Sequence, residues 1–91
     1  MLTKELPEVD EKTEVEQGWQ LILHNDEVNS FDHVINSLVK HCKHSIIQAT
    51  QCAHIVHNNG KTDVKRGKLD DLIPIQVALL DAQLSVTLDQ V

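Results

Sequence analysis

Residues 19–42 are WQLILHNDEVNSFDHVINSLVKHC, and three patterns follow one another within them. The first is a strand pattern in residues 19–24. Trp19, Leu21 and Leu23 share one face there, because successive side chains of a strand point to opposite sides. The alternation predicts a β-strand with at least one buried face.

A polar loop and an amphipathic helix follow that strand. Residues 25–29 form the loop, which is rich in Asn and Asp, and these side chains suit turns because they bond to nearby backbone groups. Asn29 or Ser30 can cap the helix through a side-chain oxygen. The apolar side chains of the helix recur at helical spacing in one continuous stripe, which consists of Phe31, Val34, Ile35, Leu38, Val39 and Cys42.

A second helix is predicted to begin after Ser45, with Gln48 at the capping-box position three residues later. Gly60 ends it, because glycine readily adopts the left-handed conformation that follows many helices. One face of this helix carries Ala49, Cys52, Ala53 and Val56.

The last third of the chain predicts a short edge strand, a third helix and a final strand. Residues 61–66 are the polar edge strand. Asp70 or Asp71 caps the third helix, and Pro74 falls in its first turn, where a missing N–H costs little. Helical spacing groups Ile73, Val77, Leu80 and Leu84, and alternation then groups Leu84, Val86 and Leu88 in the final strand.

The predicted element order is β-α-α-β-α-β. The simplest fold of this order is an α/β (α+β) two-layer sandwich, in which three helices cover a small three-stranded antiparallel sheet. We expect residues 19–91 to form this domain. Residues 1–18 contain six acidic and two basic side chains and no periodic apolar positions. They are therefore expected to be a disordered acidic N-terminal extension.

Charge and composition disfavour several classes of protein. The net charge of −6 argues against a nucleic-acid-binding protein, which usually carries a basic excess. No apolar run approaches the roughly 20 residues that span a bilayer. The N-terminus lacks the apolar core of a signal peptide, so a cytoplasmic location is expected. Cys42 and Cys52 lack CxxC spacing and are expected to be reduced, buried side chains.

Metal binding and catalysis are also disfavoured. The chain has six histidines, but zinc needs four converging ligands, and the pair His54 and His57 has no second tight pair facing it. Cys42 and Cys52 lie on apolar helix faces, where a thiol is inert. No phosphate-binding loop or nucleophile motif is present in the sequence. We therefore expect a binding protein without a cofactor, and not an enzyme.

One group of residues could bind a small ligand. The loop residues Asn25, Asp26 and Glu27 can meet His57 at one edge of a sandwich, and together they offer acceptors for an ammonium group. Apolar residues nearby could line a pocket beside that group. These are Phe31, Val34, Ala53 and Val56. The same residues also fit a solvated loop beside ordinary core, and spacing alone favours that plainer interpretation.

The sequence resembles the ClpS family, the adaptors of the Clp protease system. The resemblance is carried by LILHNDEVNSFDHVINSL at residues 21–38 and QATQCAHIVHNNGK at residues 48–61. In the second run, Ala49-Thr50, Val56-His57 and Gly60-Lys61 match the family signature. The resemblance extends from about Trp19 to Val91.

The resemblance implies a function. ClpS proteins bind N-degrons, which are substrates whose first residue is Leu, Phe, Tyr or Trp. They deliver these substrates to a hexameric AAA+ unfoldase, ClpA or ClpC, for degradation by ClpP, and perform no catalysis themselves. The implied partners are such N-terminal peptides and the N-domain of the unfoldase, with no nucleic acid and no membrane. A monomer is expected, and the N-terminal extension is expected to engage the unfoldase.

The resemblance also implies roles for individual residues. Asn25 and His57 would hold the α-amino group, with help from Asp26 or Glu27. Phe31 takes the place of a methionine that gates the pocket against β-branched side chains. The pocket positions implied are Phe31, Val34, Ala53, Val56 and Leu84, with Asn29 beside them.

Departures from the family pattern leave some points open. Glu27 replaces an Asp, Phe31 is stiffer than Met, and Ala53 replaces a larger residue, so the ranking of first residues is not fixed. The match is weakest over residues 62–71. Two alternatives are a ClpS-like protein-binding module that has lost N-degron recognition and a small His-rich metal-binding protein. The presence of Asn25 and His57 argues against the first.

Overall fold

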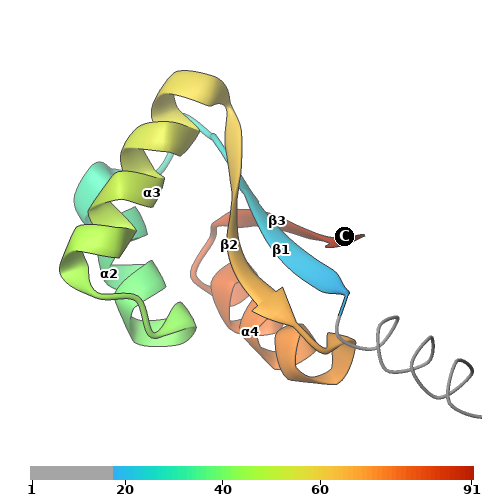
Figure 1. Cartoon of the computed structure of the whole chain (residues 1–91). Helices are drawn as coiled ribbons and strands as arrows, with labels where there is room; N and C mark the ends of the chain where they lie inside the picture. The colour runs from blue at the N-terminus through green and yellow to red at the C-terminus, as the bar shows by residue number, and fades with distance from the viewer. Residues whose placement is uncertain (1–17) are drawn as a thin grey trace, which may run out of the picture.

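The computed structural model describes residues 18–91. The predicted order of elements is confirmed (Figure 1). The elements are β1 (Trp19–His24), α2 (Phe31–Cys42), α3 (Ile46–Asn59), β2 (Lys61–Gly67), α4 (Leu69–Asp81) and β3 (Ser85–Gln90). Residues 1–17, which make up all but the last residue of the expected extension, lie outside the described part.

The three strands form one antiparallel sheet in the order β2-β1-β3. The first strand in sequence is therefore central, and the polar strand β2 lies at an edge, as predicted. A register shift between Leu21 and Ile22 marks an irregularity in the β1–β2 pairing. At the end of the sheet where β1 begins and β3 ends, the N–H of Val91 donates to the carbonyl of Gly18 at 2.6 Å.

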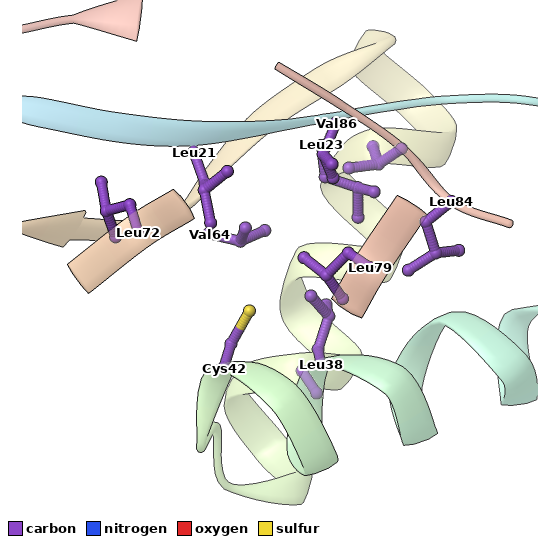
Figure 2. Packing of buried hydrophobic residues seen from close by; sticks show 11 residues of the cluster. Leu21, Leu23, Leu38, Cys42, Val64, Leu72, Leu79, Leu84 and Val86 are labelled. Carbon is purple, nitrogen blue, oxygen red and sulfur yellow. The ribbon is translucent and has the colours of Figure 1, made fainter. Parts of the chain in front are cut away.

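The core lies between the sheet and the three helices (Figure 2). Leu21 and Leu23 of β1 are 0% and 1% exposed, which confirms the face chosen from their alternation. They belong to the same buried cluster as Leu38 of α2 and Leu79 of α4. Helices from both halves of the chain therefore pack on one face of the sheet, as the two-layer prediction requires.

The ends of α2 and α3 follow the predicted capping residues. The Ser30 hydroxyl accepts from the N–H of His33 at 3.1 Å, and the Ser45 hydroxyl accepts from the N–H of Gln48 at 3.0 Å. Each bond satisfies one donor that the first turn of a helix leaves unpaired. Gly60 follows α3 with φ +95°, the left-handed conformation expected there.

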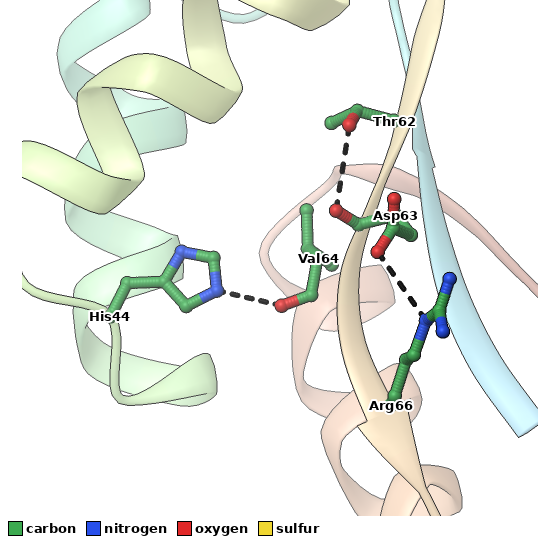
Figure 3. Close-up of polar contacts among 5 residues, drawn as sticks. All are labelled: His44, Thr62, Asp63, Val64 and Arg66. Atoms are coloured by element: carbon green, nitrogen blue, oxygen red, sulfur yellow. Dashed lines mark hydrogen bonds and ion pairs between the residues drawn. The ribbon is translucent and has the colours of Figure 1, made fainter.

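The turn between α2 and α3 is fastened to the edge strand (Figure 3). The buried side chain of His44 donates through Nε2 to the carbonyl of Val64 at 2.6 Å. Lys65 adds a bond from Nζ to the carbonyl of Cys42 at 3.1 Å. The exposed pair Asp63–Arg66, 3.8 Å apart, lies outside this junction, and pairs of its kind contribute little to stability.

The predicted details of the third helix were wrong. Helix α4 begins at Leu69 after Lys68, which makes no side-chain capping bond, and Pro74 is its sixth residue rather than part of the first turn. Asp70 and Asp71 lie inside the first turn, where the positive end of the helix dipole stabilises their negative charges. The buried residues are Leu72 and Leu79, whereas Ile73, Val77 and Leu80 are 41%, 51% and 48% exposed.

The reason for this error is the composition of the helix. Apolar side chains occupy two neighbouring stripes of α4, so spacing alone is compatible with either of them facing the sheet. Packing against β1 and α2 selects the stripe that contains Leu72, Ile75 and Leu79. Leu84 does not continue the helix but lies buried directly before β3.

Candidate functional site

A cavity of about 380 Å³ opens where four segments meet: the end of β1, the start of α2, the end of α3 and the turn between α4 and β3. Figure 1 shows how the chain passes from β1 into α2 and from α3 into β2 at the same end of the sheet. All ten residues predicted for the ligand site line this cavity. They are Asn25, Asp26, Glu27, Asn29, Phe31, Val34, Ala53, Val56, His57 and Leu84.

The backbone explains how distant residues come together at this cavity. Gly60 turns the chain out of α3 into β2, and Lys61 pairs with His24 at the end of β1. The N–H of Asn25 then donates to the carbonyl of Gly60 at 2.8 Å. This bond holds the start of the loop against the end of α3, which places Asn25 and His57 around one opening.

Asp26 organises the loop. Its Oδ1 accepts from the N–H groups of Val28 and Asn29, both at 3.1 Å, which closes an Asx-type turn. Ser85 Oγ donates to Oδ2 at 3.4 Å. Partial burial acts to raise the pKa of Asp26, but the bonds from Asn29, Val28 and Ser85 outweigh it and lower the pKa below its ordinary value. The carboxylate is therefore ionised at neutral pH.

Asn29 was expected beside the apolar positions, but its side chain makes polar bonds. Its Nδ2 donates to both carboxylate oxygens of Asp26 at 3.0 Å and to the carbonyl of Gln83 at 2.8 Å. Asn29 therefore lines the cavity through a bonded amide and contributes no apolar wall.

Three polar side chains at the opening have no such bonds. Within residues 18–91, the side chains of Asn25, Glu27 and His57 make no hydrogen bond or ion pair to the protein, and all three residues are exposed. Their amide, carboxylate and imidazole atoms are available to a ligand. Glu27 adds a negative charge, which favours a cation at this opening.

Aliphatic side chains form the wall of the cavity. Val34 comes from α2, Ala53 and Val56 come from α3, and Leu84 closes the wall from the α4–β3 turn. Of these, Ala53, Val56 and Leu84 are almost fully buried. An apolar group that enters the cavity would therefore be removed from water on several sides.

Phe31 stands between two histidines at the edge of the cavity. Its ring centroid lies 5.0 Å from that of His54 and 5.3 Å from that of His57, with interplanar angles of 74° and 76°. Such edge-to-face pairs are favoured by the charge distribution of aromatic rings. Both contacts lie at the cavity edge, and Phe31 itself is 37% exposed.

The cavity also has three lining residues that the sequence did not assign to the ligand site: Leu23, His24 and Ser30. Each lies within two positions of a predicted site residue, because Leu23 and His24 precede Asn25 and Ser30 precedes Phe31. His24 donates or accepts through Nε2 at 2.8 Å from Thr87 Oγ1, which joins β1 to β3 beside the opening. Proximity to the loop was the only signal for these three.

The two cysteines lie away from this cavity. Burial raises the pKa of the Cys42 thiol to about 11, despite the opposing effect of Lys65. Burial and the nearby Asp63 carboxylate raise the pKa of Cys52 as well. Cys52 is only half-buried, whereas the sequence predicted it to be buried. Both thiols are protonated at neutral pH, so neither has the character of an activated nucleophile.

Metal clusters and membrane-spanning helices are both absent from the described residues. No cluster of three or more His, Cys, Asp and Glu side chains in residues 18–91 is arranged to hold a metal ion. Among the helices of the same residues, none has the length and hydrophobicity needed to cross a bilayer.

An adaptor class is indicated by comparison with known proteins. The family described as ATP-dependent Clp protease adaptor protein ClpS matches residues 14–83. The chain belongs to the ClpS family, which confirms the resemblance found in the sequence. This family consists of adaptors and not of catalytic proteins.

A solved structure supports the fold independently. The chain is similar to Agrobacterium tumefaciens ClpS2 bound to L-phenylalaninamide, with a TM-score of 0.69 and 16% sequence identity. The likeness covers 80% of this chain and 95% of that chain. At this identity it establishes the shared fold. A comparison with curated proteins gave no match.

Proposed function

We propose that this protein is an N-degron receptor. It binds the free α-amino group and the large hydrophobic first side chain (Leu, Phe, Tyr or Trp) of a substrate. It then delivers the substrate to a ClpA- or ClpC-type AAA+ unfoldase for degradation by ClpP. The observation that carries the proposal is the cavity itself, where unbonded acceptors at Asn25, Glu27 and His57 adjoin an aliphatic wall.

The chemistry of an N-terminal residue fits the two halves of the cavity. An α-amine has a pKa of about 8, so it is mostly a cation with three donors at neutral pH. An amide oxygen, a carboxylate and a neutral imidazole can accept those donors. The side chain of the same residue is attached one carbon away and would enter the aliphatic part. L-Phenylalaninamide, which is bound to Agrobacterium tumefaciens ClpS2, combines these same two groups.

Fluorescence anisotropy with four labelled peptides tests the proposal. The peptides begin with Leu, Phe, acetyl-Phe and Ala. Acetylation removes the charge and two donors, and we expect a loss of at least about tenfold, the order that one charged hydrogen bond contributes. The Ala peptide should also bind about tenfold or more weakly than the Leu peptide, because it leaves the apolar wall uncovered.

Two variants make the test specific. Asn25→Ala removes an acceptor at the opening and should weaken the Leu and Phe peptides. Asn36→Ala is the matched control, because Asn36 is exposed on α2 and does not line the cavity. Weak, unselective binding of all four peptides would reject the proposal and favour a ClpS-like module without N-degron recognition.

A further inference from the structure

One amide side chain links the loop of residues 25–29, which we call the amine-binding loop after its proposed function, to the opposite wall of the cavity. Asn29 Nδ2 donates to the Asp26 carboxylate within the loop and to the carbonyl of Gln83, which lies 54 positions away in the α4–β3 turn. We call Asp26, Asn29 and the Gln83 carbonyl the loop clasp. Within the clasp, the bond from Asn29 Nδ2 to the Gln83 carbonyl, at 2.8 Å, connects the loop to the α4–β3 turn.

The donors of the clasp are fully used. An Asn amide nitrogen carries two hydrogens. One is shared by the two Asp26 oxygens, and the other is directed to Gln83. A flipped amide would place its oxygen against three acceptor atoms, so the chemistry fixes the orientation of the group. An aspartate at position 29 would have the same shape and no donor.

The clasp reaches the turn that carries a wall of the cavity. Gln83 has φ +73°, a left-handed conformation that a residue with a side chain rarely adopts. The next residue, Leu84, is 3% exposed and lines the cavity. His33 of α2 supports the same turn by donating through Nε2 to the carbonyl of Ala82 at 2.7 Å.

We propose that Asn29 is a positioning residue that sets the distance between the amine-binding loop and the Leu84 wall. A ligand whose amine and side chain are joined by one carbon needs both halves at a fixed spacing. The clasp holds that spacing before the ligand arrives, which reduces the ordering cost of binding. The inference deepens the proposed function and rests on it for the identity of the ligand.

Hydrogen exchange of the free, full-length protein tests the clasp without any ligand. The N–H groups of Gln83 and Leu84 bond to the carbonyls of Leu80 and Leu79, so their exchange reports on the order of the turn. In Asn29→Ala we expect these two amides to exchange about tenfold faster, the effect of losing one to two hydrogen bonds. The amide of Val28 should change less, because Asp26 can still accept from it.

Two controls separate this effect from general destabilisation. Asn36→Ala should leave all of these rates unchanged. The central-strand amide of Leu23 reports on opening of the core, so its rate in Asn29→Ala measures the overall loss of stability, and Gln83 and Leu84 should exchange faster than Leu23 in that variant. Rates at Gln83 and Leu84 that stay within twofold of those in Asn36→Ala would overturn the inference.

A charge-conserving exchange of two side chains is the sharper variant. In Asp26→Asn with Asn29→Asp, an amide and a carboxylate still face each other within the loop. The Gln83 carbonyl then faces an acceptor and lacks its donor. We expect fast exchange at Leu84 in this double variant. Slow exchange would show that the loop's internal bonds suffice, and the proposed link to the turn would be rejected.

Peptide selectivity gives the readout that a purely structural role would not change. If Asn29 sets the spacing of the two halves, Asn29→Ala should reduce the ratio of Leu-peptide to Ala-peptide affinity by about fivefold, within the range of one hydrogen bond. Equal weakening of both peptides would reject the positioning role. If wild type itself binds neither peptide, the proposed function fails, and the exchange rates alone decide whether the clasp exists.

Discussion

Asp26 and Glu27 are adjacent acids in different surroundings. The Asp26 carboxylate accepts from the N–H groups of Val28 and Asn29 and from the hydroxyl of Ser85. The side-chain amide of Asn29 also donates to both carboxylate oxygens. Glu27 makes no such bond within residues 18–91 and is exposed. Asp26 therefore shapes the loop, and Glu27 has the freer carboxylate for an ammonium ligand. The sequence could not distinguish these two roles, because Asp26 and Glu27 are adjacent acids of the same loop.

The lowered pKa of Asp26 predicts a pH dependence of stability. A carboxyl group whose pKa is lower in the folded state than its unfolded value of about 3.9 stabilises the fold above that value. This contribution is lost as the pH falls through the lowered pKa. Denaturant unfolding from pH 7 to pH 3 should show that Asp26→Asn is less stable than wild type at pH 7 and that the difference shrinks below about pH 4.

The control for this prediction is Glu27→Gln, which removes the same charge without removing a bond within residues 18–91. Its stability difference from wild type should be small at every pH. A difference between wild type and Asp26→Asn that is constant from pH 7 to pH 3 would contradict the stabilising role of the carboxylate.

Phe31 leads to a prediction about selectivity. The ClpS resemblance implies that Phe31 acts as the barrier to side chains branched at Cβ, and its ring packs edge-to-face against His54 and His57 at the edge of the cavity. Phe31→Ala should bring the affinity of an Ile-headed peptide closer to that of a Leu-headed peptide, by about tenfold in the ratio. Anisotropy with the two peptides measures it. An unchanged ratio would mean that the barrier is elsewhere.

Among the elements, α4 shows where periodicity stops being informative. The face of β1 that carries Leu21 and Leu23 and the stripe of α2 that carries Leu38 and Cys42 were predicted correctly, although Ile22 on the other face of β1 is also buried. Helix α4 has apolar side chains on adjoining faces, and only packing distinguishes them. Because packing buries the stripe of Leu72 and Leu79, the neighbouring apolar stripe stays exposed. It consists of Ile73, Val77 and Leu80.

Two adjacent leucines of α4 provide a matched test of its orientation. Leu79 is fully buried, and Leu80 is 48% exposed. Leu79→Ala should reduce the free energy of unfolding by about 2–5 kcal/mol, the usual cost of truncating a core leucine. Leu80→Ala should cost less than about 1 kcal/mol. Urea denaturation of both variants measures this, and equal losses would contradict the packing of α4 described above.

Across the whole molecule, the fold brings together segments that are far apart in the sequence. The order of elements and the site residues followed from periodicity and from the ClpS resemblance, and the cavity contains all ten of those residues. The contact between Asn29 and Gln83 could not be predicted, because it joins segments 54 positions apart through a turn of unusual conformation. Local patterns carry no information about such a contact.

The acidic segment before Gly18 gives a prediction at this scale. Gly18 belongs to the described structure, since its carbonyl accepts from Val91. A chain lacking residues 1–17 should therefore keep its peptide affinity. Degradation of a Leu-headed fluorescent protein by purified unfoldase and ClpP should nevertheless be lost, if this segment engages the unfoldase. Weaker peptide binding by the truncated chain would mean that residues 1–17 contribute to the binding domain.

The most direct test of the ligand site is an NMR titration of the full chain with L-leucinamide and with N-acetyl-L-leucinamide. The first has a free amine, and the second has the same side chain without the charge. We predict saturable shifts with L-leucinamide at the residues of the cavity and little change with the acetylated compound. The reporting amides are those of Asn25, Phe31, Val56, His57 and Leu84. Equal responses to the two compounds, or shifts confined to the exposed face of α4, would contradict the account.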